Sequence, residues 1–263
     1  MFTHFLPQPR LVPVRHIVSV VVPVFNEVDT VERALERLVS IPFDKEIIAV
    51  DDGSTDGTGA LLDRFVQRGR IDILLKHDSN RGKGAAIRNA FNHVTGSVVV
   101  IQDADLELDP ADIPRLLAPI EEEGAVVVYG ARDLSVQRGL SLRQYLGNRF
   151  ITFATNLCTN LRLTDVETCY KMVRTDLLRT LHLASDRFTI DPEMTIRLAQ
   201  TGVSIHEVPV SYKPRSHAEG KKITWTDGVA AIWCILRCSL LGPKPQRWAQ
   251  TSGGRARPNN TAA

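Results

Sequence analysis

The sequence Gly96-Ser97-Val98-Val99-Val100-Ile101-Gln102-Asp103-Ala104-Asp105 joins an apolar run to two carboxylates. The run is short, β-branched and continuously apolar, which predicts a buried strand. Two carboxylates spaced i, i+2 at the carboxyl end of a strand point to the same side, where open α/β sheets bind ligands. Such paired oxygen ligands suit Mg²⁺ or Mn²⁺ holding a diphosphate, and thus a nucleotide-sugar enzyme. The other interpretation, a turn that caps the following helix, is equally open from this stretch alone.

Composition and charge narrow the class of protein. The chain has 263 residues, 43% of them hydrophobic, so it can bury a substantial core. The formal net charge of +2 gives no indication of nucleic-acid binding. From Lys213 to the end, however, nine Lys or Arg stand against Glu219 and Asp227. This basic region is compatible with a phosphate-rich partner or an anionic membrane surface, but for the part beyond Lys244 we favour a solvated tail.

The cysteines, the N-terminal segment and the lengths of the apolar runs indicate where in the cell the protein is found. Four cysteines, without His or Cys neighbours at zinc-site spacing, are predicted to be buried thiols in a reducing compartment. Met1 to His16 lacks the apolar core of a signal peptide. No apolar run reaches the roughly 18–20 residues that span a bilayer. We therefore predict a cytoplasmic protein that is soluble or attached to the cytoplasmic face of a membrane.

Strand and helix patterns alternate through the first half of the chain. The predicted strands are Ile17–Val24, Glu46–Val50, Ile71–Leu75, Val98–Gln102 and Ala125–Tyr129. Helical spacing of apolar residues separates them, which predicts an α/β fold with a doubly wound, mostly parallel sheet. We divide the chain into an N-terminal extension (1–15), the α/β domain (16–225), an amphipathic helix (226–242) and a disordered basic tail (243–263).

Four loops at predicted strand ends carry the chemistry. They are Pro23–Glu27, Asp51–Gly57, Asn80–Gly84 and Asp103–Glu107. Because the carboxyl ends of parallel strands share one edge, the four loops are expected to converge there. Lys83 can neutralise a phosphate. The spacing of a Walker A loop is absent, and no Gly-x-Gly-x-x-Gly follows the first strand, which disfavours NTPase and dehydrogenase folds.

The ordered set of loops resembles the family 2 glycosyltransferases with the GT-A fold. The resemblance runs from about Val18 to Val229, on Pro-Val-Phe-Asn-Glu, Asp-Asp-Gly-Ser-Thr-Asp-Gly-Thr, Asn-Arg-Gly-Lys-Gly and Asp-Ala-Asp. Three later segments, Thr164–Lys171, Asp191–Glu193 and Glu219–Ile223, look like those of dolichyl- or polyprenyl-phosphate sugar synthases of the dolichol-phosphate mannosyltransferase type. The resemblance implies a nucleotide-sugar crevice at the strand carboxyl ends.

The resemblance also implies roles for individual residues. The donor nucleotide would be bound by Pro23, Phe25, Glu27, Asp51, Asp52, Lys83, Asp103 and Ala104. A divalent cation, Mg²⁺ or Mn²⁺, would be held by Asp103, Asp105 and Glu107. Two departures stand out: many relatives carry Gln in place of Glu107, and some carry C-terminal membrane helices that this sequence lacks.

A lipid phosphate acceptor sets its own requirements. A phosphate monoester has a second pKa of about 6, so it is largely a dianion at neutral pH and needs cations rather than a strong base. Besides Asp105, the catalytic candidates are Arg132, Arg215 and Lys222, with Lys221 as an acceptor candidate. Arg143 and Arg149 are better explained as surface cations.

Three carboxylates are candidates for the sugar or the acceptor site: Asp165, Glu167 and Glu193. Asp165 and Glu167 could instead form local salt bridges with Lys171 or Arg174. Glu193 lies in the first turn of a predicted helix, where the macrodipole alone favours a carboxylate.

The sequence thus predicts metal-dependent, inverting transfer of a hexose from a nucleoside-diphosphate sugar to a polyprenyl phosphate. The expected partners include a membrane surface or a membrane subunit, and no nucleic acid. The helix from Thr226 to Leu241 could lie on that membrane or pack as core. Two other functions stay open: a family 2 enzyme with a saccharide or other hydroxyl acceptor, and a non-catalytic nucleotide-sugar-binding subunit.

Overall fold

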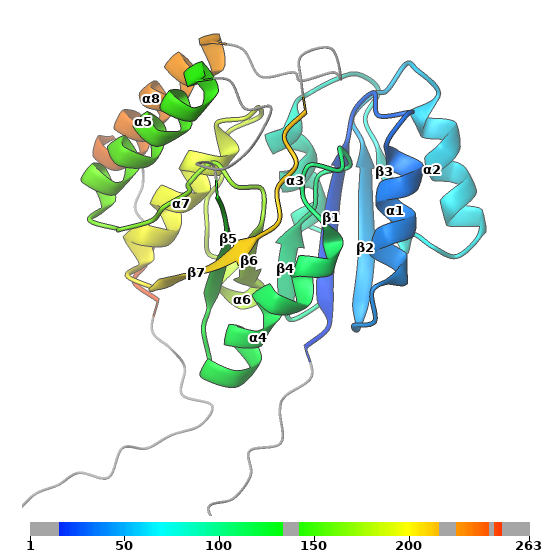
Figure 1. Ribbon diagram of the computed structural model, residues 1–263, viewed down its shortest axis with the longest axis horizontal. Helices are drawn as coiled ribbons and strands as arrows, with labels where there is room; N and C mark the ends of the chain where they lie inside the picture. Colours follow the sequence, from blue (N-terminus) through cyan, green and yellow to red (C-terminus); the bar gives the residue numbers. More distant parts are fainter. Residues whose placement is uncertain (1–15, 134–141, 216–224, 242–244, 249–263) are drawn as a thin grey trace, which may run out of the picture.

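A computed structural model describes residues 16–133, 142–215, 225–241 and 245–248 of the chain (Figure 1). In order, the elements are β1 (Val18–Val24), α1 (Val31–Ser40), β2 (Lys45–Asp51), α2 (Thr58–Gln67), β3 (Ile73–Lys76), α3 (Lys83–Phe91), β4 (Val98–Ile101), η1 (Pro110–Asp112), α4 (Ile113–Glu123), β5 (Val127–Arg132), α5 (Leu142–Thr159), β6 (Lys171–Arg174), α6 (Thr175–Leu178), α7 (Ile190–Thr201), β7 (Ile205–Val210) and α8 (Trp225–Leu240).

The strands form one seven-stranded sheet in the order β3-β2-β1-β4-β6-β5-β7. The first four strands are mutually parallel, and β5 is parallel to β7. Between them β6 runs antiparallel to both β4 and β5, so β5 points the same way as β4. The predicted doubly wound, mostly parallel sheet is therefore confirmed, and the carboxyl ends of β1 to β5 and β7 share one edge.

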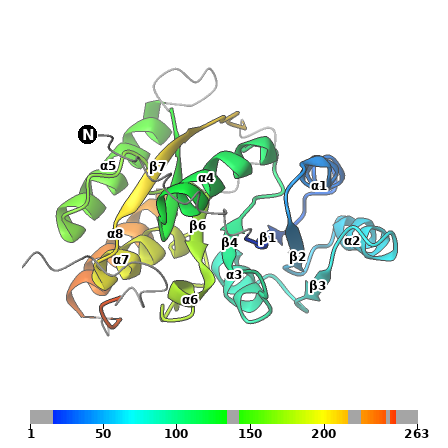
Figure 2. The same ribbon diagram turned by 90° about the horizontal axis from the view of Figure 1, so that it is seen from below.

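Burial explains why these segments are strands. All four residues of β4 and five of the first six residues of β1 are buried, and most of them are valine. β-branched side chains are favoured on a pleated surface that is covered on both faces. Helices α3 and α4 lie on opposite sides of the sheet (Figure 2). The apolar core runs continuously through the sheet and the helices that cover it.

A second, smaller cluster holds α5, α7 and α8 together. Its buried members are Ile151, Ile196, Ala231, Cys234, Ile235 and Cys238. The three helices lie beside one another at the edge of the molecule that β7 occupies (Figure 1). The predicted C-terminal helix thus uses one of its faces as core. No helix within the described residues is long and apolar enough to cross a membrane.

Several expectations are corrected. Strand β6 and helix α6 were not predicted. Cys158 is exposed, whereas the other three cysteines are buried as expected. In the predicted disordered tail, the backbone N–H of Trp248 donates to the carbonyl of Thr201 over 2.9 Å, and its side chain packs against the main core. Residues 245–248 therefore lie against the domain. The predicted extension 1–15 and the rest of the tail lie outside the described residues.

Candidate active site

The loops after β1, β2, β3 and β4 meet at the carboxyl edge of the sheet, as predicted. Direct contacts join them. Lys83, at the start of α3, donates to Asp103 after β4 over 2.8 Å. Glu27 donates its backbone N–H to Thr58 of α2 over 2.9 Å, which ties the first loop to the second. The edge is therefore a cluster of polar side chains from at least four strand ends.

Asp52 anchors the loop that follows β3. It is 2% exposed and accepts four hydrogen bonds: from His77, whose Nδ1 lies 2.6 Å away, from the Asn80 side chain at 3.0 Å, and from the backbone N–H groups of Arg81 and Gly82 at 3.0 and 2.7 Å. Both carboxylate oxygens are thus engaged within the protein. The predicted donor-binding role of Asp52 stays a prediction, and its position makes it a support for the loop that carries Lys83.

Asp51 lies deeper in the same edge. It is 6% exposed and accepts from the backbone N–H of Ser54 over 2.9 Å. Its other oxygen lies against α2, where a Cβ on Gly59 would come within 2.7 Å of it. Pro23, near the end of β1, and Phe25, just after it, are both half-buried, while Ala104 is buried in the core. These four residues were predicted to bind the donor nucleotide, and that role stays a prediction.

Lys83 and Asp103 form a partly covered ion pair, with side chains 15% and 24% exposed. Burial alone lowers the pKa of a lysine, but Asp103 beside it raises the pKa of Lys83 well above its ordinary value. Burial raises the pKa of Asp103, and Lys83 outweighs it, so the pKa of Asp103 ends below its usual range. Both groups are therefore charged at neutral pH.

Asp105 has the opposite environment. Burial, and then the negative charges of Asp103 and Glu107, raise the pKa of Asp105 to about 7. The guanidinium of Arg215 partly offsets this effect: its Nη2 lies 3.0 Å from an Asp105 oxygen. Arg215 also donates to both oxygens of Glu27, over 3.0 and 3.3 Å. The structure thus places Arg215 against the predicted donor-side carboxylates, although the sequence had favoured the acceptor phosphate.

Glu107 joins this edge to the segment that follows β7. Its carboxylate accepts from the hydroxyl of Tyr212 at 3.1 Å and from the backbone N–H of Arg215 at 2.9 Å. Leu106 before it has a φ of +64°, a conformation uncommon for non-glycine residues, and this left-handed residue turns the chain between Asp105 and Glu107. Glu107 therefore holds Arg215 in place, and its predicted metal-ligand role stays a prediction.

A buried arginine–carboxylate pair lies at the end of β5. Arg132 donates from Nε and Nη2 to the two oxygens of Asp165 over 2.6 and 2.9 Å, and the side chains are 9% and 1% exposed. Burial alone lowers the pKa of Arg132, but the neighbouring Asp165 raises it above its ordinary value. The guanidinium also lies 4.9 Å from the ring centre of Tyr212. Asp165 thus contacts a predicted acceptor cation and not Lys171 or Arg174.

Behind this pair lies a second buried pair. Lys171 is fully buried and donates to Asp191 over 2.7 Å and also to the carbonyl of Thr168. Asp191 also lies 3.9 Å from the Nζ of Lys83, so it connects the two halves of the site. Burial, then the charge of Asp191, raises the pKa of Glu167 to about 7. The Oε1 atom of Glu167 is buried and has no hydrogen-bond partner.

The remaining predicted residues divide into two groups. Glu193 is fully buried and accepts from the backbone N–H groups of Ala184 and Ser185, which fixes the loop before α7. Lys221 and Lys222 lie outside the described residues. Their predicted roles, and that of Glu193 at the sugar, stay predictions.

Sequence reasoning missed Tyr212 and His77 and gave Lys171 no role. Tyr212 lies two residues after the end of β7, so the rule that ligands bind at strand carboxyl ends would have identified it. No local signal marks His77 or Lys171, because both owe their place to carboxylates far away in the sequence.

The fit of a divalent cation can be judged from the carboxylates. Among the described residues, no three His, Cys, Asp or Glu side chains are arranged as a metal ligand set. Mg²⁺, however, needs only one or two carboxylates, because water and phosphate oxygens supply its other ligands. Asp105, crowded by the like charges of Asp103 and Glu107, is the carboxylate that a cation would relieve most. The oxygen donors at this edge therefore fit a phosphate-bound Mg²⁺ or Mn²⁺.

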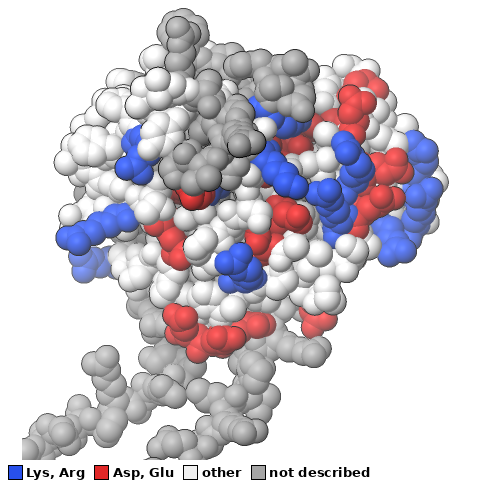
Figure 3. All heavy atoms as spheres, viewed as in Figure 1, with Lys and Arg blue, Asp and Glu red and all other residues white. Residues whose placement is uncertain are grey.

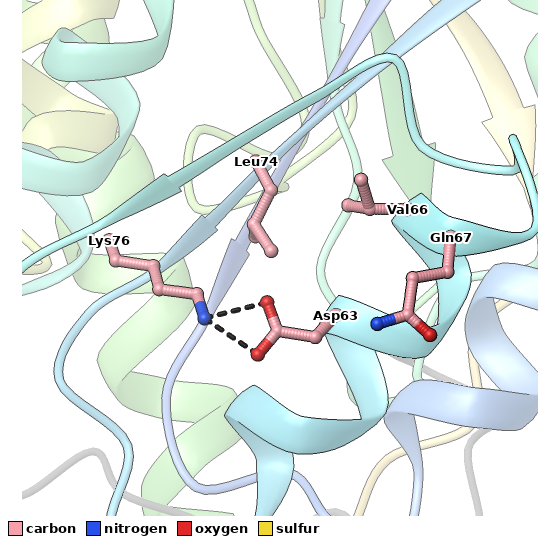
Figure 4. A pocket seen from close by; sticks show the side chains of 5 residues that line it. All are labelled: Asp63, Val66, Gln67, Leu74 and Lys76. Atoms are coloured by element: carbon pink, nitrogen blue, oxygen red, sulfur yellow. Dashed lines mark hydrogen bonds and ion pairs between the residues drawn. The ribbon is translucent and has the colours of Figure 1, made fainter.

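A surface hollow of about 410 Å³ lies elsewhere, between α2 and β3 (Figure 4). Asp63, Val66, Gln67, Leu74 and Lys76 line it, and Lys76 bridges it by an ion pair to Asp63 at 2.7 Å. It shares none of its lining residues with the cluster of carboxylates and cations. The candidate site is therefore the strand edge and not this hollow.

Comparisons with known proteins identify relatives of this chain. Residues 19–181 match the family model "Glycosyl transferase family 2". The undecaprenyl-phosphate 4-deoxy-4-formamido-L-arabinose transferase of Pseudomonas fluorescens (strain Pf0-1) is 32% identical over 215 residues, which are 78% of this chain and 60% of that protein. An uncharacterised protein of Methanocaldococcus jannaschii is 25% identical over 209 residues, 75% of this chain and 89% of that protein. The chain thus spans about 60% of the length of the named transferase.

Solved structures support the fold. A crystal structure of glucosyl-3-phosphoglycerate synthase from Mycobacterium tuberculosis, with Mn²⁺, UDP-glucose and phosphoglyceric acid, has a TM-score of 0.66 at 20% identity, over 85% of this chain and 80% of that one. The same enzyme with Mg²⁺ and UDP gives a TM-score of 0.65. These structures establish the GT-A type of α/β fold. The family match over more than half of the sequence shows that this chain belongs to glycosyl transferase family 2.

Proposed function

We propose that this glycosyltransferase transfers a hexose from a nucleoside-diphosphate sugar to a polyprenyl phosphate, with inversion at the anomeric carbon and with help from Mg²⁺ or Mn²⁺. One observation supports it best: Arg132, whose side chain is only 9% exposed, ends β5 on the same sheet edge as the Asp103 and Asp105 carboxylates. A carboxylate edge suits a metal-bound diphosphate, and a desolvated arginine fork suits a phosphate acceptor.

Contacts connect the two sides of the proposed site. The Arg132 guanidinium stacks on Tyr212, whose hydroxyl donates to Glu107. Glu107 in turn accepts from the backbone of Arg215, whose side chain reaches Asp105. Acceptor and donor groups would therefore be held by one connected set of side chains, which is what an in-line reaction requires.

In the proposed reaction, the cationic side chains would bind phosphate groups and the carboxylates would bind the metal ion. Arg132 would hold the acceptor phosphate, which is already largely a dianion at neutral pH and needs no strong base. Lys83 and Arg215 would stabilise negative charge on the departing diphosphate. Asp105, with Asp103, would bind the cation, which supplies Lewis-acid stabilisation to the same leaving group. Attack by the phosphate oxygen opposite the leaving diphosphate inverts the anomeric centre.

The names of several relatives point to the same acceptor. Undecaprenyl-phosphate 4-deoxy-4-formamido-L-arabinose transferases of Pseudomonas fluorescens and Edwardsiella ictaluri are among them, at 32% and 30% identity. An acceptor of this class lies in a membrane, so we place the chain at a cytoplasmic membrane face, attached peripherally or through a membrane subunit.

A second candidate is a family 2 enzyme with a hydroxyl acceptor, and one residue favours it. A hydroxyl needs a general base with a pKa near the working pH. The raised pKa of Glu167, about 7, and its unpartnered buried oxygen fit that role. Asp165 and Asp191 do not, because each is bound to a buried cation.

A transfer assay tests the proposal. The purified chain is mixed with Mg²⁺ or Mn²⁺, a short polyprenyl phosphate and each labelled nucleotide sugar in turn, and label is counted in the organic phase. We expect metal-dependent label from one donor. Arg132→Gln should raise the KM for the lipid by about 10²-fold, since a lost charge-assisted bond to phosphate is worth about 1.5–3 kcal/mol.

Arg174 provides a matched control, because it is an exposed arginine paired with Asp176, and Arg174→Gln should leave the KM unchanged. Metal-dependent release of nucleoside diphosphate without label in lipid would contradict the proposed acceptor. Loss of that hydrolysis in Glu167→Gln would then favour the hydroxyl acceptor.

A further inference from the structure

Helices α5 and α8 are apolar on two opposite faces. Their inner faces pack into the small cluster with α7, through Ile151 on α5 and through Ala231, Cys234, Ile235 and Cys238 on α8. A helix at the surface of a soluble domain normally has one apolar stripe and a polar outer face. The outer faces of this pair therefore need an explanation.

The outer faces carry large apolar side chains at helical spacing. On α5 they are Leu142, Leu146, Phe150, Phe153 and Leu157, with exposures from 55% to 74%; on α8 and just after it they are Val229, Trp233, Leu236, Leu240 and Leu241, with exposures from 43% to 78%. The described residues contain thirteen exposed large hydrophobics, and ten of them lie here. So concentrated a patch is typical of a surface that binds a partner.

The charges around the patch indicate the kind of partner. Helix α5 contains no Asp or Glu, and α8 contains only Asp227, which is half-buried in its first turn. Arg149 on α5 and Arg237 on α8 are both exposed. In Figure 3 the upper left of the molecule, where α5 and α8 lie, is mainly white with isolated blue. An apolar face with phenylalanine, tryptophan and arginine, and with a single, half-buried acid, matches the headgroup region of an anionic bilayer.

We propose that the outer faces of α5 and α8 together form a two-helix platform that lies in the surface of an anionic lipid bilayer. Phe150, Phe153 and Trp233 enter the apolar boundary, and Arg149 and Arg237 meet lipid headgroups. The sequence had indicated this contact for the C-terminal helix alone. The platform needs both helices, because the row of exposed apolar side chains on either helix alone is narrow.

The platform deepens the proposed function and rests on it for its biological meaning. Arg132 and Arg215, the two described arginines of the site, lie ten residues before the first residues of α5 and α8, respectively. Both helices thus begin close in sequence to the strand ends that form the site. A platform in the bilayer surface brings that edge to the headgroup of a lipid acceptor.

Vesicle flotation tests the platform without donor, acceptor or metal. The full chain is floated with phosphatidylcholine vesicles that contain or lack phosphatidylglycerol, and Trp233 fluorescence is recorded. We expect binding and a blue shift that Trp233→Phe removes. The double variant Phe153→Ser/Trp233→Ser should lower the partition coefficient about a hundredfold, since each large apolar side chain contributes about tenfold.

Two further variants sharpen the test. Ile17→Ser/Val66→Ser is the matched control, because these side chains are 53% and 40% exposed but lie away from α5 and α8. It should bind within twofold of the unaltered chain. Arg149→Gln/Arg237→Gln should lower binding about thirtyfold on phosphatidylglycerol vesicles and leave the weaker binding to phosphatidylcholine unchanged. Circular dichroism melts check that each variant is folded.

Failure of the platform and failure of the proposed function give different results. No flotation of the unaltered chain, while transfer to a short acceptor proceeds in detergent, overturns the platform alone. Self-association that Phe153→Ser/Trp233→Ser abolishes, without vesicle binding, also overturns it and makes the face a protein interface. Flotation without lipid transfer supports the platform and contradicts the proposed acceptor.

Discussion

The Arg132–Asp165 pair makes the sharpest prediction about this protein. Asp165→Asn keeps the size of the side chain and removes its charge. The guanidinium of Arg132, 9% exposed, then loses the carboxylate that meets it at 2.6 and 2.9 Å. Because Arg132 cannot release its proton, its charge stays in a site with little water.

The size of the effect follows from burial. Removing one partner of a buried ion pair lowers the free energy of unfolding by about 3–5 kcal/mol, because the other charge is left uncompensated. At about 2–4 °C per kcal/mol for a chain of this size, the Tm should fall by roughly 6–20 °C. Because the ring of Tyr212 faces the guanidinium and still stabilises its charge, we expect the loss of stability to be at the lower end of this range.

A double-mutant cycle measures the interaction energy between Asp165 and Arg132. Urea unfolding is recorded for four chains: the unaltered chain, Asp165→Asn, Arg132→Gln and the double variant. The interaction energy of the cycle should be about 2–3 kcal/mol, the upper range for residues in contact. Asp63→Asn serves as the control, because Asp63 and Lys76 form a pair whose side chains are 49% and 48% exposed. It should change stability by less than about 1 kcal/mol.

Two results would refute the reasoning. If Asp165→Asn costs no more than Asp63→Asn, the pair at the end of β5 behaves as a surface pair and Arg132 is not desolvated. If the effects of Asp165→Asn and Arg132→Gln simply add, the two side chains do not interact in solution. Either result would also remove the observation on which the proposed phosphate site depends.

Three further predictions concern other parts of the site. Asp105→Asn should reduce transfer about 10³-fold, as expected for the loss of several kcal/mol of electrostatic stabilisation, while thermal melts stay unchanged because the amide replaces a carboxylate whose pKa is already about 7. Burial and then Asp191 raise the pKa of Glu167 from 4.5 to about 7, so the contribution of this carboxyl to stability is complete below pH 4.5 and is lost as pH rises from there through 7. Glu167→Gln should therefore be more stable than the unaltered chain by about 1–2 kcal/mol at pH 8, with no such gain at pH 4, and an equal gain at both pH values would exclude this cause. Gly53→Ala should lose about 2–4 kcal/mol in urea unfolding, because Gly53 has a φ of +74° and a Cβ there would lie 2.6 Å from the backbone of Ser79; unchanged stability would show that the loop can move aside.

The parallel half of the sheet could be predicted from the sequence because its signals are local. The buried strands are runs of β-branched residues, and Gly or Asp-Pro marks the ends of the helices between them. Since parallel strands bring their carboxyl ends to one edge, the order of the strands along the chain is enough to place the loops carrying Glu27, Asp52, Lys83 and Asp103 together.

The antiparallel strand β6 could not be predicted in the same way. It has four residues, begins with Lys171 and ends with Arg174, so no apolar run marks it. Lys171 is tolerated inside the sheet because Asp191, twenty residues later, neutralises it. A pattern read along the chain contains no information on such a distant partner.

Side-chain roles were harder to predict than loop positions for the same reason. Asp52 and Glu193 have the residue type expected of ligand-binding groups. The structure instead directs their oxygens at backbone N–H groups of neighbouring loops. A carboxylate in a loop signals that something donates to it, and only the fold decides whether the donor is a ligand or the chain.

The pairing of charges gives one more constraint on how the site works. Lys83, Arg132 and Arg215 each meet a carboxylate already: Asp103, Asp165 and Glu27, respectively. Phosphate groups that bind here would have to share these cations with carboxylates or displace them. A phosphate therefore gains less binding free energy here than it would from an unpaired cation. In return, the carboxylates hold the cations in position before the substrates bind, so little reorganisation is needed to reach the transition state.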